Sequence, residues 1–168
     1  MGTKAPIDDT SWRILTELQA NARLSFTELG RRVGLTAPAV AERVHRLEEA
    51  GVIAGYRLEL DHERLGLPLL AFVRLRARDG KCAEFAGVAE RLPEVLESHR
   101  ITGTESYVLK AAVRGVRHLE DLIDRLMPWG ETTTSVVLSS PVTHRVLEPE
   151  VVREPAPADD PIAQRDSA

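Results

Sequence analysis

Two arginines, three residues apart on one predicted helix, are the side chains of this sequence with the clearest chemical potential. Arg43 and Arg46 lie in the stretch GLTAPAVAERVHRLEEAG, residues 34–51. A guanidinium group offers several N–H donors in a planar fork, which suits both guanine edges and phosphate oxygens. Small residues at the front of the helix would let it approach a DNA groove closely. The pattern predicts DNA contacts from Ser25, Thr27, Thr36, Ala37, Pro38, Ala39, Arg43 and Arg46.

Local charge supports this prediction only weakly. Between Arg23 and Arg57 there are six arginines and four glutamates, a local charge of +2 in a chain whose net charge is -4. An excess of this size also fits a solvated helical surface with no nucleic-acid partner.

The arginines need a rigid support, and capping residues predict three short helices before residue 51. Asp8 can cap a first helix, and Ile7 just before it can pack on Trp12 as a hydrophobic staple. A second helix begins at Ser25, where Glu28 completes a capping-box pattern.

The third helix begins at Thr36 and ends at Gly51, with Pro38 in its first turn, where a missing N–H breaks no helical hydrogen bond. Gly34 lies in the turn of about three residues before it, and such a turn joins two helices at a steep angle. The arrangement predicts a helix-turn-helix. A small helical bundle that serves as a dimerisation module is the alternative.

The residues after Gly51 change period. Tyr56, Leu58 and Leu60 alternate with other residues, which indicates a strand or an extended segment. Three helices followed by a short strand predict a winged variant of the helix-turn-helix.

The second half of the chain predicts a different unit, an α+β fold of the ferredoxin-like βαββαβ type. Its strands and helices are expected, in order, over residues 69–76, 81–92, 94–102, 106–113, 118–126 and 132–140. Both helices would cover one face of the antiparallel sheet. Phe72, Val108 and Val137 would then lie on the open face, which invites a second sheet from another subunit.

These patterns divide the chain into a tail (1–7), a winged helix-turn-helix domain (8–60), a ferredoxin-like effector and oligomerisation domain (61–148) and a disordered tail (149–168). Pro, Ala and Asp dominate the last segment. No apolar run approaches the roughly 18 residues of a membrane span, and the N-terminal residues lack a signal-peptide core. The single Cys82 fits a reducing compartment. We therefore expect a cytoplasmic protein with no membrane partner.

Catalytic and metal-binding patterns are absent from the sequence. The five histidines are scattered, and no Cys-x-x-Cys pair or phosphate-binding glycine loop is present. Cys82 has no designated base, and Glu105 has no second carboxylate beside it in sequence. We expect no cofactor, no metal and no enzymatic activity.

The order of these elements resembles the Lrp/AsnC, or feast/famine, regulators of bacteria and archaea. The resemblance is carried by ILTELQANARLSFTELGRRVGLTAPAVAERVHRLEEAGVIAGY, LGLPLLAFV, TGTESYVLK and TTTSVVLS, and it runs from about residue 7 to residue 147. It implies a nucleoid-associated regulator with its third helix in the major groove of double-stranded DNA. It also implies homodimers that form higher oligomers, and small-molecule effectors, usually amino acids, bound between C-terminal domains.

One position departs from the family pattern. Many members place an acidic residue three positions after the glycine of the loop before the third strand, where this chain has Ser106, with Glu105 beside it. A serine cannot neutralise an α-ammonium group as a carboxylate does. Either Glu105 substitutes, or the effector is held differently, or no free amino acid binds.

The same resemblance predicts an effector site in which backbone N–H groups and threonine hydroxyls receive the carboxylate of an amino acid. Its predicted members are Gly103, Thr104, Glu105, Ser106, Tyr107, Thr132, Thr133 and Thr134. A tight turn beside an ordinary threonine-rich strand is the structural alternative. The chain is thus expected to be a sequence-specific transcriptional regulator. An architectural DNA-binding protein, or an amino-acid sensor with little sequence specificity, is the second possibility.

Overall fold

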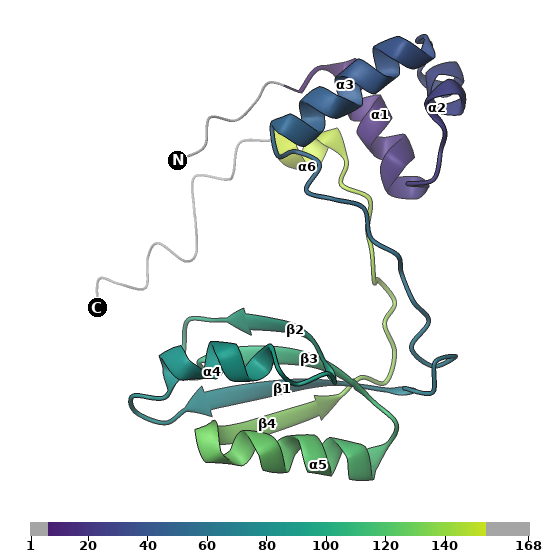
Figure 1. The fold of residues 1–168 in the computed structure, drawn as a ribbon. Helices are drawn as coiled ribbons and strands as arrows, with labels where there is room; N and C mark the ends of the chain where they lie inside the picture. Colours follow the sequence, from purple (N-terminus) through teal and green to yellow (C-terminus); the bar gives the residue numbers. More distant parts are fainter. Residues whose placement is uncertain (1–6, 154–168) are drawn as a thin grey trace. The chain divides into compact units, whose positions relative to one another are not determined.

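The computed structural model describes residues 7–153, which form two compact units (Figure 1). The first unit runs to Arg57 and includes the chain again from Val142, whereas the second spans Leu58–Pro141. The two units are described separately below.

The first unit contains the three predicted helices, α1 (Asp9–Ala20), α2 (Phe26–Val33) and α3 (Ala37–Glu49). Each begins at the predicted cap: Asp8 accepts a hydrogen bond from the Ser11 N–H, and Ser25 and Thr36 do the same for the N–H groups three residues ahead. The Glu28 carboxylate binds Arg31 and Arg32, so it does not complete the capping box predicted with Ser25.

The turn between α2 and α3 is as short as predicted. Gly34 has φ +75° and ends α2, and the Leu35 N–H donates to the Gly30 carbonyl at 2.9 Å. A Cβ at Gly30 would lie only 2.5 Å from the Leu35 carbonyl oxygen. The absence of a side chain at Gly30 therefore lets the turn fold closely against α2, and the helix-turn-helix prediction is confirmed.

The three helices bury two separate apolar clusters. The larger one lies between all three helices and contains Ile14, Leu18, Leu29, Val33, Val40 and Val44. The smaller one consists of Trp12, Leu15 and Leu47, with Ile7 packed against it as the staple prediction requires.

Two predictions at the edges of this unit were wrong in detail. Residues 54–60 are not part of any strand, so the part of the chain that the structure describes has a helix-turn-helix without a wing strand. Residues 149–153, predicted as the start of a disordered tail, form the short helix α6 (Pro149–Arg153). The rest of that predicted tail, 154–168, lies outside the described residues, as do residues 1–6 of the predicted N-terminal tail.

The second unit has the predicted βαββαβ order. It comprises β1 (Leu69–Ala77), α4 (Cys82–Ala89), β2 (Val95–Arg100), β3 (Tyr107–Val113), α5 (Val116–Leu126), a 3-10 turn (Met127–Trp129) and β4 (Gly130–Val136). All pairings are antiparallel, in the order β2-β3-β1-β4. The ferredoxin-like prediction is confirmed. The first helix ends earlier than predicted, and the last strand begins and ends earlier.

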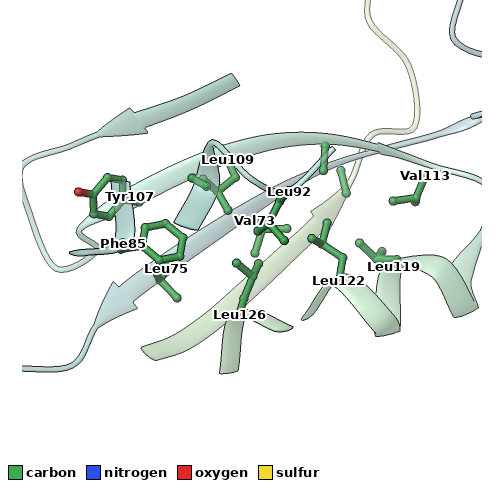
Figure 2. Packing of buried hydrophobic residues seen from close by; sticks show 13 residues of the cluster. Val73, Leu75, Phe85, Leu92, Tyr107, Leu109, Val113, Leu119, Leu122 and Leu126 are labelled. Atoms are coloured by element: carbon green, nitrogen blue, oxygen red, sulfur yellow. The ribbon is translucent and has the colours of Figure 1, made fainter. Parts of the chain in front are cut away.

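One face of this sheet is packed and the other is open. Val73, Leu75 and Leu109 point from the strands toward Phe85 of α4 and toward α5, with Leu122 and Leu126 among the buried residues of the same cluster (Figure 2). Phe85 also meets Tyr107 edge to face, with ring centroids 4.8 Å apart. On the opposite face, Phe72 remains 42% exposed. The open face predicted from the alternation is therefore present, with Phe72 as an exposed apolar residue and with Arg74 and Lys110 on the same face.

No helix within residues 7–153 is both long and apolar enough to cross a membrane.

Candidate DNA-binding and ligand-binding sites

The outward side of α3 is a polar surface. Val40, Val44 and Leu47 face the core, so residues at the intervening positions face solvent. The exposed set is Pro38, Glu42, His45, Arg46, Glu48 and Glu49. Arg46, one of the predicted DNA contacts, belongs to this exposed set. Its side chain is 63% exposed and forms an ion pair with Glu42 at 3.2 Å.

Arg43 occupies a different environment from Arg46. Its guanidinium donates to both carboxylate oxygens of Asp8, at 2.7 and 3.0 Å, and to the Ser11 hydroxyl at 3.2 Å. Only 29% of its side chain is exposed. Hydrogen bonds from Ser11 and Arg43 lower the pKa of Asp8 to about 2. Arg43 thus joins the middle of α3 to the start of α1, and its predicted DNA contact stays a prediction that would require this ion pair to open.

The other predicted DNA contacts lie at the starts of α2 and α3. Ser25, Thr27, Thr36 and Pro38 are exposed, and Ala37 and Ala39 are half-buried. The hydroxyl oxygens of Ser25 and Thr36 accept the capping N–H groups. Their O–H hydrogens remain able to donate to a phosphate oxygen.

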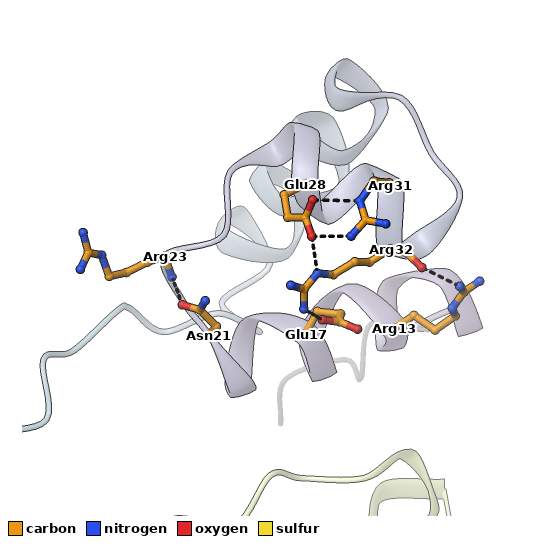
Figure 3. Close-up of polar contacts among 7 residues, drawn as sticks. All are labelled: Arg13, Glu17, Asn21, Arg23, Glu28, Arg31 and Arg32. Carbon is orange, nitrogen blue, oxygen red and sulfur yellow. Dashed lines mark hydrogen bonds and ion pairs between the residues drawn. The ribbon is translucent and has the colours of Figure 1, made fainter.

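A network of carboxylates neutralises the arginines of α2. Glu28 accepts from both Arg31 and Arg32 at 2.8–3.0 Å, and Arg32 also pairs with Glu17 of α1 at 2.8 Å (Figure 3). The hydrogen bonds from Arg31 and Arg32 lower the pKa of Glu28 to about 2. Arg23 lies apart from this network in Figure 3, in the connection between α1 and α2. Sequence reasoning counted Arg23 in the local charge but did not select it as a contact, although it lies two residues before the Ser25 cap.

The predicted effector loop has two parts: Thr104 and Glu105 contact each other, whereas Ser106 and Tyr107 contact the sheet and the core. The Thr104 hydroxyl donates to the Glu105 carboxylate at 2.7 Å, and Glu105 is half-buried. This hydrogen bond lowers the pKa of Glu105, with smaller contributions from the positive charges of Arg74 and Arg76 on β1. The carboxylate is therefore ionised near neutral pH and lies within the electrostatic reach of two arginines.

Ser106 and Tyr107 have structural partners of their own. The Ser106 hydroxyl accepts the Ala77 N–H at 3.2 Å, and the Ser106 N–H donates to the Leu75 carbonyl at 2.8 Å. Tyr107 is buried, and its hydroxyl donates to the Cys82 carbonyl at 2.8 Å. The side chain of Tyr107 is thus part of the core, whereas Gly103, Thr104 and Glu105 belong to the loop outside β3.

The three predicted threonines of β4 do not lie on one face. Thr132 and Thr134 stand opposite Leu75 and Val73, whose side chains face the helices, whereas Thr133 stands opposite Arg74 on the open face. Among the three, only Thr133 therefore shares a face with Arg74. Sequence reasoning missed Arg74 and Arg76, although their alternation with Val73 and Leu75 was the available signal.

A third polar cluster connects the residue before β2 to α5. Glu94 accepts hydrogen bonds from His118 Nε2 at 2.9 Å and from Arg125 at 2.6 Å. Burial alone would raise the pKa of Glu94, but these bonds and its own backbone N–H outweigh burial and bring the pKa to about 2. His118 Nδ1 accepts the Arg114 N–H, so the cluster holds the start of α5 in place. Within the described residues no group of three His, Cys, Asp or Glu side chains is arranged to hold a metal ion.

A helix-turn-helix followed by a four-stranded α+β domain defines a class of two-domain DNA-binding regulators. The family model of the AsnC-type helix-turn-helix domain matches residues 7–48, and that of the Lrp/AsnC ligand binding domain matches residues 70–147. The chain belongs to the Lrp/AsnC family of transcriptional regulators.

Relatives agree with this assignment along nearly their whole lengths. The HTH-type transcriptional regulator YezC of Bacillus subtilis is 46% identical over 138 residues, which cover 82% of this chain and 98% of YezC. The structure of Bacillus subtilis LrpC has a TM-score of 0.79 at 34% identity and covers 83% of this chain and 99% of LrpC. The complex of the Neisseria meningitidis regulator NMB0573 with L-Met has a TM-score of 0.82 at 30% identity and covers 88% and 99% of the two chains. These relatives are named as transcriptional regulators.

Proposed function

We propose that this regulator binds specific DNA sequences through α3 and that an amino acid bound by its second domain changes its assembly or its DNA affinity. The observation that carries the first half is the exposed polar face of α3 on a rigid, capped helix-turn-helix. In DNA complexes of this motif the second helix of the pair enters the major groove. Arg46 would donate to guanine or phosphate, and Glu42 and His45 would lie beside it.

The ion pairs of the arginines on α2 and α3 favour specific over architectural binding. Sequence-independent binding rests on unpaired cations that neutralise phosphates. Here Arg31, Arg32, Arg43 and Arg46 each have a carboxylate partner within the unit. Exposed pairs of this kind contribute little to stability, so base contacts at a matching site can open them while random DNA gains little.

The second half of the proposal rests on Glu105 and on the polar residues of β1 and β4 on the open face of the sheet. An α-amino acid carries an ammonium group, which Glu105 would accept, and a carboxylate, which Arg74, Arg76 and Thr133 would receive. Glu105 would then bind the ammonium group in place of the acidic residue that many family members have at the position of Ser106. Support comes from the L-Met bound to the Neisseria regulator and from a Haemophilus influenzae relative, 37% identical, named leucine-responsive regulatory protein.

Calorimetry with the twenty amino acids, first on the parent and then on Glu105→Gln, tests this site. Glu105→Gln keeps the shape of the side chain and removes the charge, so the selected amino acid should bind more weakly than it binds the parent. Glu120→Gln on α5 is the matched control, because it removes an exposed carboxylate from the helical side. Its affinity should equal that of the parent.

Two results would count against the amino-acid site. Equal affinity of Glu105→Gln and the parent would show that Glu105 is not the partner of the ammonium group. If no amino acid binds the parent at millimolar concentration, the loop is structural. Where binding is found, DNA must change amino-acid affinity by the same factor by which the amino acid changes DNA affinity.

A further inference from the structure

The C-terminal segment returns to the DNA-binding unit and forms a reciprocal pair of hydrogen bonds with α1. The Leu147 N–H donates to Gln19 Oε1 at 2.9 Å, and Gln19 Nε2 donates to the Leu147 carbonyl at 3.3 Å. A primary amide pairs here with a backbone amide in the manner of a neighbouring strand. Because both donors and both acceptors are used, the contact fixes the segment at one residue.

A second contact lies five residues further along the chain, at Val152. Val152 of α6 packs against the small apolar cluster of Trp12, Leu15 and Leu47 on α1 and α3. Its neighbour Val151, on the same short helix, is 70% exposed. The segment therefore covers an apolar surface of the DNA-binding unit with one specific side chain.

This contact extends beyond the matched family region. The ligand-binding family model ends at residue 147, and α6 begins at Pro149. The alignment with YezC already uses 98% of that relative's length over 138 residues. Val152 therefore lies outside the residues that the two family models match.

The return of the segment gives the DNA-binding unit two covalent connections to the sheet, one before β1 and one after β4. These strands are neighbours, and the start of β1 adjoins the end of β4, because Ala71 pairs with Val136 and the Val137 N–H donates to the Leu70 carbonyl at 2.9 Å. A single connection, residues 58–68, contains hydrogen-bonded turns between Asp61 and Leu67 and would restrict the unit less than two connections do. A second connection fastened at Leu147 allows only positions that both segments can reach.

We propose that residues 147–152 are an intramolecular clasp, which fastens the C-terminal segment to the DNA-binding unit and thereby makes the regulator selective for the spacing between DNA half-sites. The inference rests on the proposed function, because spacing matters only where two such units read one DNA. With the clasp closed, two linked units reach half-sites of one separation. With the clasp open, each unit is joined to the sheet by one segment alone and tolerates other separations.

Val152→Asp opens the clasp, and Val151→Asp is its matched control on the same helix. Amide hydrogen exchange provides the first measurement and needs no DNA. In the parent and in Val151→Asp, the Leu147 amide should exchange slowly, and in Val152→Asp it should exchange as fast as an unstructured amide. Gln19→Ala should release the same amide without touching the apolar cluster. A Leu147 amide that is unprotected in the parent, or equally protected in all four proteins, overturns the clasp.

Binding to a selected DNA site and to the same site with five extra base pairs between half-sites provides the second measurement. The insertion turns one half-site by about half a helical turn. The parent and Val151→Asp should lose at least tenfold in affinity, and Val152→Asp should lose less than threefold. An equal loss in all three proteins overturns the proposed role in spacing. Failure of the parent to prefer any sequence would count instead against the proposed function, and the exchange measurement would still decide the clasp.

Discussion

At the scale of single residues, the two arginines of α3 should behave differently when each is replaced. Arg46 is exposed and pairs with Glu42. We expect Arg46→Ala to weaken specific DNA binding by roughly 1–3 kcal/mol and to leave the free energy of unfolding within about 0.5 kcal/mol of the parent. Binding titrations against a selected site and a random site, at one salt concentration, would measure this. An unchanged affinity for both DNAs would remove Arg46 from the interface.

Arg43→Ala should act on stability and on its pH dependence. The pair with Asp8 is half exposed, so its loss should cost only about 0.5–1 kcal/mol. The pKa of Asp8 is about 2 in the folded state against an ordinary 3.8, so the carboxylate stabilises the fold above about pH 4 and loses this effect as the pH falls toward 2. Without Arg43 the pKa rises toward its ordinary value, and acid unfolding should begin at a higher pH. Acid titrations of both proteins, followed by the NMR amides of α1 and α3, provide the check. Identical curves would contradict the structural role.

The sequence could indicate which residues carry chemistry but not how each is engaged. Arg43 and Arg46 looked equivalent because helical spacing does not reveal that Asp8, 35 residues earlier, lies beside one of them. The family resemblance of TGTESYVLK predicts Ser106 and Tyr107 in the effector loop. In the structure, Tyr107 begins a strand and faces the core. In each case a residue distant in sequence determines the environment of the side chain: Asp8 for Arg43, and the core residues of the second unit for Tyr107.

At the scale of elements, Gly30 is the residue on which the helix-turn-helix turn depends most closely. A methyl group there would lie 2.5 Å from the Leu35 carbonyl oxygen, which is backbone and cannot rotate away. We expect Gly30→Ala to destabilise the DNA-binding unit by about 1–3 kcal/mol and to weaken DNA binding by displacing α3. Thermal unfolding by circular dichroism would measure the first effect. Stability equal to or above that of the parent would contradict the close packing of this turn.

Most elements were predictable because their signals are local. The caps at Asp8, Ser25 and Thr36 and the alternation in the strands depend on neighbours within a few residues. The errors arose where distant partners decide the outcome. Tyr56, Leu58 and Leu60 alternate like a strand but have no strand pairing in the described chain, and α6 depends on its contact with the cluster around Trp12.

At the scale of the whole molecule, the open face of the sheet should be the dimer interface. Phe72 lies on that face at 42% exposure, and a lone subunit would leave it in water. We expect the parent to be a dimer or a larger assembly at micromolar concentration, and Phe72→Lys to shift it toward monomer, because the substitution would place a charge in an apolar contact. Light scattering would measure the mass of both. A monomeric parent, or an unaffected variant, would contradict this interface.

The central claim, that this chain reads DNA sequence through α3, is tested most directly by one ratio of affinities. A binding site selected from random DNA would be titrated beside a scrambled site of equal length at one physiological salt concentration. We expect a preference of about 10³-fold or more for the selected site, with two half-sites about one helical turn or a multiple of it apart. Equal affinity for the two DNAs would contradict the claim and would identify the protein as an architectural DNA-binding protein.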